Sequence, residues 1–490
     1  MADTIHIDGH PISPDHYING RRVTSTETFE TFCPVDQKVL GKISAGLDEH
    51  VDAAVGAAQA AFPGWAALGA AGRLPYLERF AEEIGKREEA LALAEANDAG
   101  VLLSRMRHGI VPRAMLNITW FAKEALTLQD RVIETAQAIH QVRHDPAGIC
   151  AIITPWNSPL MLATWKAGPA LASGNTVVIK PPEWAPLTTS LLADAADAAG
   201  LPPGVFNVVQ GMGATTGARL VSDPRLARIS FTGSVPTAKL VASAAAANLV
   251  PCSLELGGKS PFIVLADADL DAAAATGALM YRNAGQVCLA GTRFLVHESI
   301  RDAFVEKMRA VVANLVVGDP RDPATEVGPI IHPRQVERVA GFVERAKAAG
   351  ATTLWGGERH DFGPQYFQPT MFCDVSNDAE IVQQEVFGPV LVMQSFASDE
   401  EAIALANSTV YGLGGICYGE QDHAQAVADQ VRTGFIWINS FTIRDLAAPF
   451  GGRGQSGVGR EGGEWSFDFF CDVKDVITPK HPFKASFAHR

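Results

Sequence analysis

Apolar and polar positions recur along the chain with two different patterns. Residues 48–62 and 73–96 carry apolar side chains three and four positions apart, which predicts amphipathic helices. From about residue 146, short apolar runs alternate with alanine-rich segments of helical spacing. The runs predict buried strands and the segments predict intervening helices, so we expect a parallel sheet covered on both faces.

This alternation extends through most of the chain. The runs that predict strands in the first region are 148–155, 176–181, 205–211 and 228–233. The segments that follow them are 160–173, 188–200, 215–223 and 237–250. The rhythm resumes after residue 260 with a strand at 261–269 and a helix at 269–285. We therefore expect a second α/β domain.

Two segments fit neither domain. Residues 127–146 and 469–483 show the alternation of strands, with many charged side chains. Detached strands of this kind often pair with another subunit. An ordinary surface hairpin is the alternative, and the pattern alone does not choose between them.

Composition narrows the class of protein. A chain of 490 residues exceeds what one hydrophobic core usually serves. The net charge of −14 argues against nucleic-acid or anionic-membrane partners, although a small anionic substrate responds only to local charge. Seven widely spaced cysteines show no disulfide framework or metal-binding pair. With a polar N-terminus and no long apolar run, we expect a cytoplasmic enzyme without a metal.

Two glycine-containing turns are candidates for a nucleotide site. The segment "QGMGATTG" includes Gly213 and lies between a predicted strand and a helix, where a plain glycine-rich turn is equally expected. In "SFTGSVPTAK", Gly233 ends a strand and Ser234 stands where a helix begins. A helix N-terminus attracts phosphate, but Ser234 also suits simple capping.

Two charged residues follow another strand of the first region. Lys180 and Glu183 in "VVIKPPEWAP" stand at a strand end, where doubly wound sheets bind ligands. A carboxylate there accepts hydrogen bonds from ribose hydroxyls and repels a 2′-phosphate. A solvated surface pair is the alternative.

Three residues are candidates for catalysis. Glu255 in "SLELGGKSP" is an acidic residue at an otherwise apolar strand end. Asn157 in "TPWNSP" stands between prolines that stiffen the loop, which suits an oxyanion donor, although asparagine is common in turns. Cys288 in "RNAGQVCLAG" is a nucleophile or a buried filler, and a lone cysteine is more often the latter.

Taken together, these segments resemble the aldehyde dehydrogenase superfamily over essentially the whole chain. The motifs occur in the family's order, as "PWNSP", "KPPE", "FTGS", "LELGGKSP", "GQVCLAG", "EVFGPV" and "PFGGRGQSGVGRE". The resemblance implies an α/β fold with a Rossmann-like NAD-binding domain, an α/β catalytic domain and a small β oligomerisation arm. We place these at 1–126 with 147–254, at 255–456, and at 127–146 with 468–490.

The resemblance also implies roles for individual residues. Cys288 matches the nucleophile, Glu255 the general base of hydrolysis and Asn157 the oxyanion donor, while Glu461 matches a proton-relay residue of some members. The positions that match cofactor contacts are Trp156, Lys180, Glu183, Gly213, Gly233, Ser234, Leu256, Glu385 and Phe387. The implied reaction is NAD-dependent oxidation of an aldehyde through a thiohemiacetal and a thioester, with NADP use left open. Members that form acyl-coenzyme A lack the glutamate, so its presence favours hydrolysis.

Two arginines bear on the substrate. Arg113 and Arg444 fall in segments that line the family's substrate tunnel, and the context "RDL" with "GREGGEWSFDFF" resembles the branch that oxidises hydroxymuconic semialdehydes, including the carboxymethyl-substituted one. Two arginines at such positions hold a substrate carboxylate in that branch. The chain departs from the branch in lacking a second basic residue after Arg444, and structural salt bridges are the alternative for both arginines.

Other readings of the site stay open. Trp156, Trp165 and Phe450 also suit a neutral aromatic or terpenoid aldehyde. An inactive structural paralogue would be expected to lack one of the three catalytic residues, and all three are present. We therefore expect a small-molecule aldehyde as partner, and a homodimer or homotetramer.

Overall fold

The apolar runs after residue 146 form the middle of an eight-stranded sheet in the computed structural model, which describes residues 3–128 and 131–483. From edge to edge its strands are β21 (Gly457–Val458), β13 (Cys252–Glu255), β12 (Leu226–Thr232), β9 (Ile149–Ile153), β10 (Thr176–Lys180), β11 (Phe206–Val208), β3 (His16–Ile18) and β4 (Arg21–Val23). Strands β13 to β11 are parallel, as the pattern predicted. Strands β21, β3 and β4 pair antiparallel at the two edges, which the pattern did not predict.

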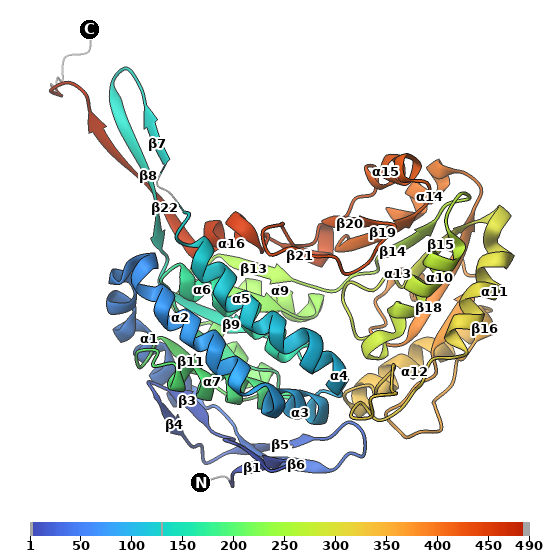
Figure 1. The fold of residues 1–490 in the computed structure, drawn as a ribbon, viewed down its shortest axis with the longest axis horizontal. Helices are drawn as coiled ribbons and strands as arrows, with labels where there is room; N and C mark the ends of the chain where they lie inside the picture. Colours follow the sequence, from blue (N-terminus) through green and yellow to red (C-terminus); the bar gives the residue numbers. More distant parts are fainter. Residues whose placement is uncertain (1–2, 129–130, 484–490) are drawn as a thin grey trace.

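Both faces of this sheet are covered by helices, and its central strands β9 to β12 are buried at nearly every position. On β10, Val177 and Ile179 pack against one layer of helices, whereas Val178 packs against the other. The first layer holds α6 (Pro159–Ala172) and α7 (Leu187–Ala198), backed by α2 (Gly69–Lys86), α3 (Glu88–Asp98) and α5 (Val111–Glu124). The second holds α1 (Asp48–Ala67), α8 (Ala218–Val221) and α9 (Val235–Ala246). Figure 1 shows these layers around the sheet.

The segment 73–96 forms two helices. Arg87 leaves the helical conformation, with φ −103° and ψ 16°, and divides the segment into α2 and α3. Between α3 and α5 the chain makes the short helix α4 (Leu103–Arg105) and a π-helical turn, η1 (Met106–Ile110). These turns direct α5 back along α6.

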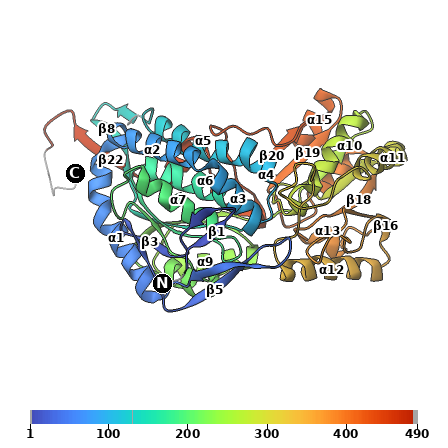
Figure 2. The ribbon, with the colours of Figure 1, turned by 60° about the horizontal axis from the view of Figure 1, so that its bottom comes forward.

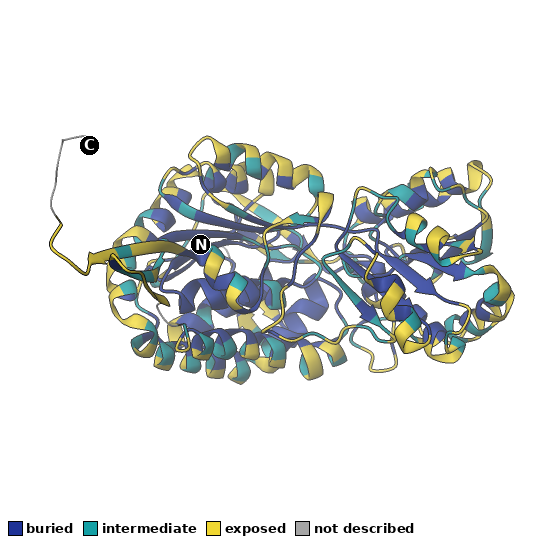
Figure 3. Cartoon of the chain, turned by 90° about the horizontal axis from the view of Figure 1, so that it is seen from above, coloured by how far each residue is buried: buried dark blue, intermediate teal, exposed yellow. Residues whose placement is uncertain are grey.

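The second α/β region forms a seven-stranded sheet beside the first (Figures 1 and 3). Its strands in order are β16 (Thr352–Trp355), β17 (Thr370–Cys373), β18 (Val390–Phe396), β15 (Arg293–His297), β14 (Pro261–Val264), β19 (Gly414–Tyr418) and β20 (Phe435–Ile438). The helices packed around it are α10 (Leu270–Ala278), α11 (Arg301–Val312), α12 (Pro333–Ala348), α13 (Glu380–Gln383), α14 (Asp399–Ala406) and α15 (Gln421–Ala428). All of its strand pairs are parallel except β16 with β17.

The two segments that fit neither domain pair with each other. Strand β8 (Ala138–Pro146) lies between β7 (Arg131–Glu134) and β22 (Cys471–Pro479) in a three-stranded antiparallel sheet. This sheet projects from the body of the molecule (Figure 1). Its side chains Val132, Val473 and Ile477 are exposed. We call these three strands the arm.

The remaining elements lie around the first sheet and its helices. The hairpins β1 (Ile5–Ile7) with β2 (His10–Ile12), and β5 (Thr28–Phe32) with β6 (Val39–Ser44), pack against each other and against helices α3 and α7 (Figure 2). Helix α16 (Gly463–Phe470) leads from β21 into the arm. Within the described ranges, no helix combines the length and apolarity that crossing a bilayer requires.

Candidate active site

The parallel strands of the first sheet bring most predicted site residues to one edge. Glu255 is the last residue of β13 and Lys180 the last of β10, while Asn157 follows β9 and Ser234 follows β12. Because the carboxyl ends of parallel strands share an edge, side chains from distant parts of the sequence meet there.

The loop that holds Cys288 is shaped by left-handed backbone. The helix predicted for 269–285 is α-helical only to Ala278, and Asn283, Ala284 and Gly285 then have φ of 53°, 52° and 69°. Alanine rarely adopts this conformation, because its Cβ clashes with the backbone. The turn places Cys288 at the site rather than on a helix.

Two hydrogen bonds join this loop to the one that carries Asn157. The Asn283 amide donates to the Asn157 carbonyl at 3.1 Å, and Asn157 Nδ2 donates to the Gln286 carbonyl at 2.9 Å. A primary amide carries two N–H groups. Asn157 therefore has a second donor for a ligand while the first fixes its side chain. Sequence reasoning did not single out Asn283 or Gln286.

The Gly257–Gly258 turn after β13 allows Glu385 and Cys288 to approach. A Cβ on Gly257 would lie 2.0 Å from Glu385 Oε2, and one on Gly258 would lie 3.2 Å from the Cys288 carbonyl oxygen. Glu385 Oε1 accepts a hydrogen bond from the Gly258 amide at 3.0 Å. The turn needs glycine because these groups occupy the space of its side chains.

Cys288 lies among groups that favour the neutral thiol. Burial, followed by the charges of Glu385 and Glu255, raises its pKa to about 12, while the charge of Arg444 acts in the opposite direction. Glu255 is 4% exposed, and neither carboxylate oxygen has a hydrogen-bond partner in the described residues. Burial, followed by the charge of Glu461, raises the pKa of Glu255 well above its usual value. Glu255 is therefore a carboxyl group suited to accepting a proton.

Glu461 lies in a buried polar network that the sequence analysis missed. Its Oε1 accepts hydrogen bonds from Lys166 Nζ at 2.6 Å and from the hydroxyls of Ser253 and Ser230 at 3.1 and 3.2 Å. Burial would raise the pKa of Glu461, but Lys166 and the hydrogen bonds outweigh it, and the pKa lies below its usual value. The signal was Lys166 itself, a lysine within the apolar helix 160–173.

Among the predicted cofactor residues, Lys180, Glu183 and Gly213 come together. Lys180 Nζ donates to Glu183 Oε2 at 3.0 Å, and a Cβ on Gly213 would lie 3.7 Å from Glu183 Oε1. Burial opposes the ionised form of Glu183, but Lys180 lowers its pKa below the usual value. An ionised carboxylate next to a glycine leaves room for a ribose, and the carboxylate accepts hydrogen bonds from its two hydroxyl groups.

The other predicted cofactor residues occupy three further places. The rings of Trp156 and Phe387 pack edge to face, with their centroids 5.2 Å apart. Gly233 precedes α9. The Ser234 hydroxyl accepts a hydrogen bond from the Thr237 backbone amide at 3.4 Å, so Ser234 caps this helix, which was the alternative to a phosphate-binding role. Leu256 is buried in the turn after β13.

Arg113 and Arg444 converge on one aromatic ring. Their guanidinium carbons lie 5.9 and 4.9 Å from the centroid of Trp165, and that of Arg444 lies 3.9 Å from the centroid of Phe450. Arg113 donates to Asn117 Oδ1 at 3.1 Å. Within the described residues neither arginine forms an ion pair. Burial, followed by the charge of Arg113, lowers the pKa of Arg444 to about 10.

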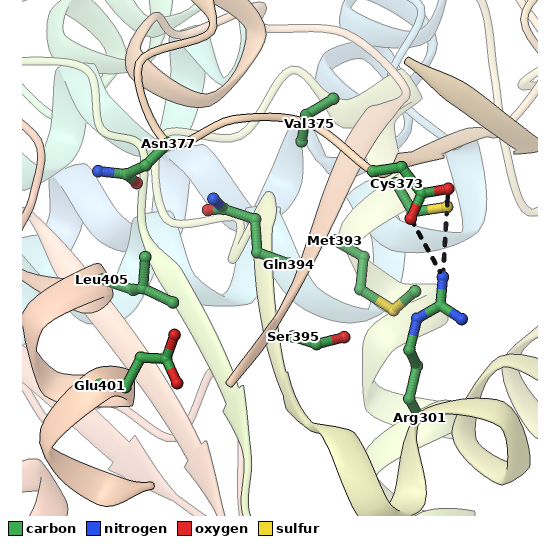
Figure 4. Close-up of a pocket in the computed structure, with 10 residues that line it drawn as sticks. Arg301, Cys373, Val375, Asn377, Met393, Gln394, Ser395, Glu401 and Leu405 are labelled. Carbon is green, nitrogen blue, oxygen red and sulfur yellow. Dashed lines mark hydrogen bonds and ion pairs between the residues drawn. The ribbon is translucent and has the colours of Figure 1, made fainter. Parts of the chain in front are cut away.

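A pocket elsewhere contains none of the predicted residues. It has a volume of about 350 Å³ and lies against β18 and α14 (Figure 4). Arg301 lies at one side, 3.6 Å from both the Cys373 thiol and Asp374 Oδ1. No group of three or more histidine, cysteine, aspartate or glutamate residues suited to a metal ion occurs among the described residues.

Comparison with known proteins identifies the family. The model of the aldehyde dehydrogenase family matches residues 22–476. The chain belongs to this family. The α/β fold and the enzyme class predicted from the sequence are thereby confirmed.

Individual relatives cover nearly the whole chain. A 2-hydroxymuconic semialdehyde dehydrogenase of Pseudomonas sp. strain CF600 is 40% identical over 94% of this chain and 98% of its own. The crystal structure of HpcC from Thermus thermophilus has a TM-score of 0.95 and 41% identity, over 97% of this chain and 95% of its own. The P. syringae indole-3-acetaldehyde dehydrogenase AldA, a mutant in complex with NAD+ and IAA, has a TM-score of 0.93 and 37% identity, over 96% and 97%. The bound NAD+ of that relative supports the predicted cofactor.

Proposed function

We propose that this aldehyde dehydrogenase oxidises a semialdehyde that carries a carboxylate, with NAD+ as the oxidant. The observation that carries this proposal is the pair Arg113 and Arg444, two guanidiniums on one ring with no ion-pair partner among the described residues. Both side chains are half-buried, and a partly desolvated cation without an ion-pair partner is stabilised by a bound carboxylate. The semialdehyde dehydrogenase among the relatives supports the same substrate class.

Cys288 is the proposed nucleophile. Because its surroundings favour the neutral thiol, the partly exposed Cys288 thiol first gives its proton to solvent, and the thiolate then attacks the aldehyde carbon. The Asn157 amide and the Cys288 backbone N–H hold the oxyanion of the thiohemiacetal, and one such donor contributes about 3–4 kcal/mol. When bound, NAD+ accepts the hydride that leaves this carbon.

Glu255 activates the water that hydrolyses the thioester. Its unpaired oxygens leave it free to take the proton of that water. Glu461, which is paired with Lys166, is the proposed relay that passes protons between Glu255 and the buried polar network. The water releases the carboxylic acid and restores the thiol.

Glu183 is the proposed determinant of cofactor choice. With Lys180 and Gly213 it would hold the adenosine ribose, and its negative charge would repel a 2′-phosphate. Trp156, Phe387 and Glu385 would contact the nicotinamide end, and Ser234 and Gly233 the pyrophosphate.

The substrate class is tested by initial rates with NAD+. A carboxylated muconic-type semialdehyde, a neutral aromatic aldehyde and a long aliphatic aldehyde are compared for the wild type and for Arg444→Gln. We expect the acidic aldehyde to have the highest kcat/KM, and the variant to lose about 10- to 100-fold for it alone. A wild type that prefers the neutral aromatic aldehyde would favour the second candidate, which the aromatic rings of Trp165 and Phe450 and the indole-3-acetaldehyde relative support.

We also propose that the arm pairs with another copy of the chain, giving a homodimer or homotetramer. Its exposed Val132, Val473 and Ile477 support this, because apolar side chains on a projecting sheet are a favourable contact surface. The division into NAD-binding, catalytic and arm domains stays part of the same proposal.

A further inference from the structure

Trp165 contacts both charged parts of the site. It lies on α6, is 4% exposed, and packs edge to face with Phe121 and Phe450. Its ring lies under the guanidiniums of Arg113 and Arg444, and its indole N–H donates to Glu461 Oε2 at 2.5 Å. One side chain therefore touches the two cations and the buried acid.

The contact with Glu461 is specific to an indole. Glu461 Oε1 has three partners, Lys166, Ser230 and Ser253, whereas Oε2 has Trp165 as its partner in the described part of the chain. A phenylalanine would fill most of the same volume but would leave this buried, charged oxygen unpaired. A buried tryptophan N–H in turn needs an acceptor, so each group satisfies the other.

The contact with the arginines is of a different kind. A cation over the face of an indole ring is attracted by the electron density of the ring. Trp165 has only two rotatable side-chain bonds, and both are fixed by the Glu461 bond and by the flanking rings. The ring is thus a rigid support that sets where the guanidiniums lie.

We infer that Trp165 is a positioning residue that ties the arginine pair to Glu461, so that one rigid side chain aligns the substrate carboxylate with the acids that handle protons. This inference rests on the proposed roles of Arg444 and Glu461. Tryptophan acts through those residues and not on the reacting atoms. Its two functions separate, because the N–H serves Glu461 and the ring serves the arginines.

The N–H function is tested with Trp165→Phe, Glu461→Gln and the double variant. We expect Trp165→Phe to lower kcat about tenfold for acidic and neutral aldehydes alike, with the KM of the acidic aldehyde nearly unchanged and a rapid first-turnover burst of NADH retained. If Trp165 acts through Glu461, the double variant has the kcat of Glu461→Gln to within about twofold. Losses that multiply in the double variant would overturn the inference.

The ring function is tested with Trp165→Leu beside Phe450→Leu. Trp165→Leu should add a rise of about tenfold or more in the KM of the acidic aldehyde, and leave the KM of the neutral aldehyde unchanged. Phe450→Leu, which removes the other ring against Arg444 but spares the Glu461 bond, should show the KM effect without the kcat effect. Equal losses for both aldehydes in KM and kcat, in proportion to the folded fraction, would make Trp165 a purely structural residue.

Failure of the positioning role and failure of the proposed function give different kinetic results. If Arg444→Gln affects both aldehydes alike, the carboxylate assignment fails. The cycle of Trp165 with Glu461, measured with the neutral aldehyde, still decides the positioning role.

Discussion

Glu255→Gln removes a charge whose surroundings oppose it, and the structure predicts opposite effects on turnover and on stability. Glutamine has nearly the same shape but cannot accept the proton of water, so thioester hydrolysis should slow by roughly 10²–10⁴-fold, the usual contribution of a general base. Both oxygens of Glu255 are buried without partners, and an unsatisfied buried polar group costs about 1–3 kcal/mol, more when charged. Part of that cost should disappear in the variant.

The pH dependence of the stability gain follows from the direction of the pKa shift. The folded-state pKa of Glu255 lies well above 4.5, so as the pH rises the unfolded chain loses this proton first. Folding of the wild type therefore becomes less favourable relative to the variant above about pH 4.5. We expect the difference in urea midpoint, variant minus wild type, to grow between about pH 5.5 and about pH 8.5.

Two assays check these effects on the same preparations. Rapid mixing with aldehyde and NAD+ should show a full burst of NADH followed by slow turnover, and urea titrations should give the stability difference. The variant also loses a charge that raises the pKa of Cys288, so alkylation of the thiol at a fixed pH should be faster than in the wild type. A variant without a burst, and with slower alkylation, would show that Glu255 promotes thiol ionisation rather than hydrolysis.

Three further predictions concern other parts of the molecule. Cys288→Ala should abolish turnover while NAD+ binding, followed by fluorescence titration, survives; activity within about tenfold of the wild type would refute the nucleophile assignment. NAD+ should be preferred over NADP+ by at least about tenfold in kcat/KM, and Glu183→Gln should reduce that ratio; an unchanged ratio would mean that Glu183 does not face the 2′ position. Replacing Val473 and Ile477 together by lysine should shift the assembly to smaller species in light scattering, whereas an unchanged mass would place the subunit contact elsewhere.

The elements with strong periodicity could be predicted from the sequence. Strand β9 is apolar at every position and β10 at its three central positions because both faces of these strands are covered, and this pattern predicted the parallel sheet and its ligand-binding edge. Strands β3 and β21 have three and two residues, too few for any pattern to develop. They are strands because a neighbour in space pairs with them.

The site was predictable where a motif carries the chemistry and unpredictable where tertiary contacts carry it. Asn157 and Cys288 could be named from their motifs, but the hydrogen bond from Asn283 that joins their loops spans 126 positions. The sequence suggested Trp165 only as part of the pocket wall, because no nearby residue indicates that its N–H bonds to Glu461, 296 positions away. A sequence alone does not state which distant groups share a buried network.

The turn after β13 has a mechanical consequence. The chain passes from the first sheet to β14 of the second through residues 256–260 and returns to β21 of the first through residues 439–456. Gly257 and Gly258 lie where Glu255 approaches Glu385 and the Cys288 loop. Both connections run beside catalytic groups, Glu255 at the first and Glu461 after the second, so any rotation of one sheet against the other would change the gap between the base and the thiol. In an enzyme built this way, stiffness at the two connections matters as much as the side chains around them, and mutations that loosen the packing between the two sheets should slow the chemistry without touching a single reacting atom.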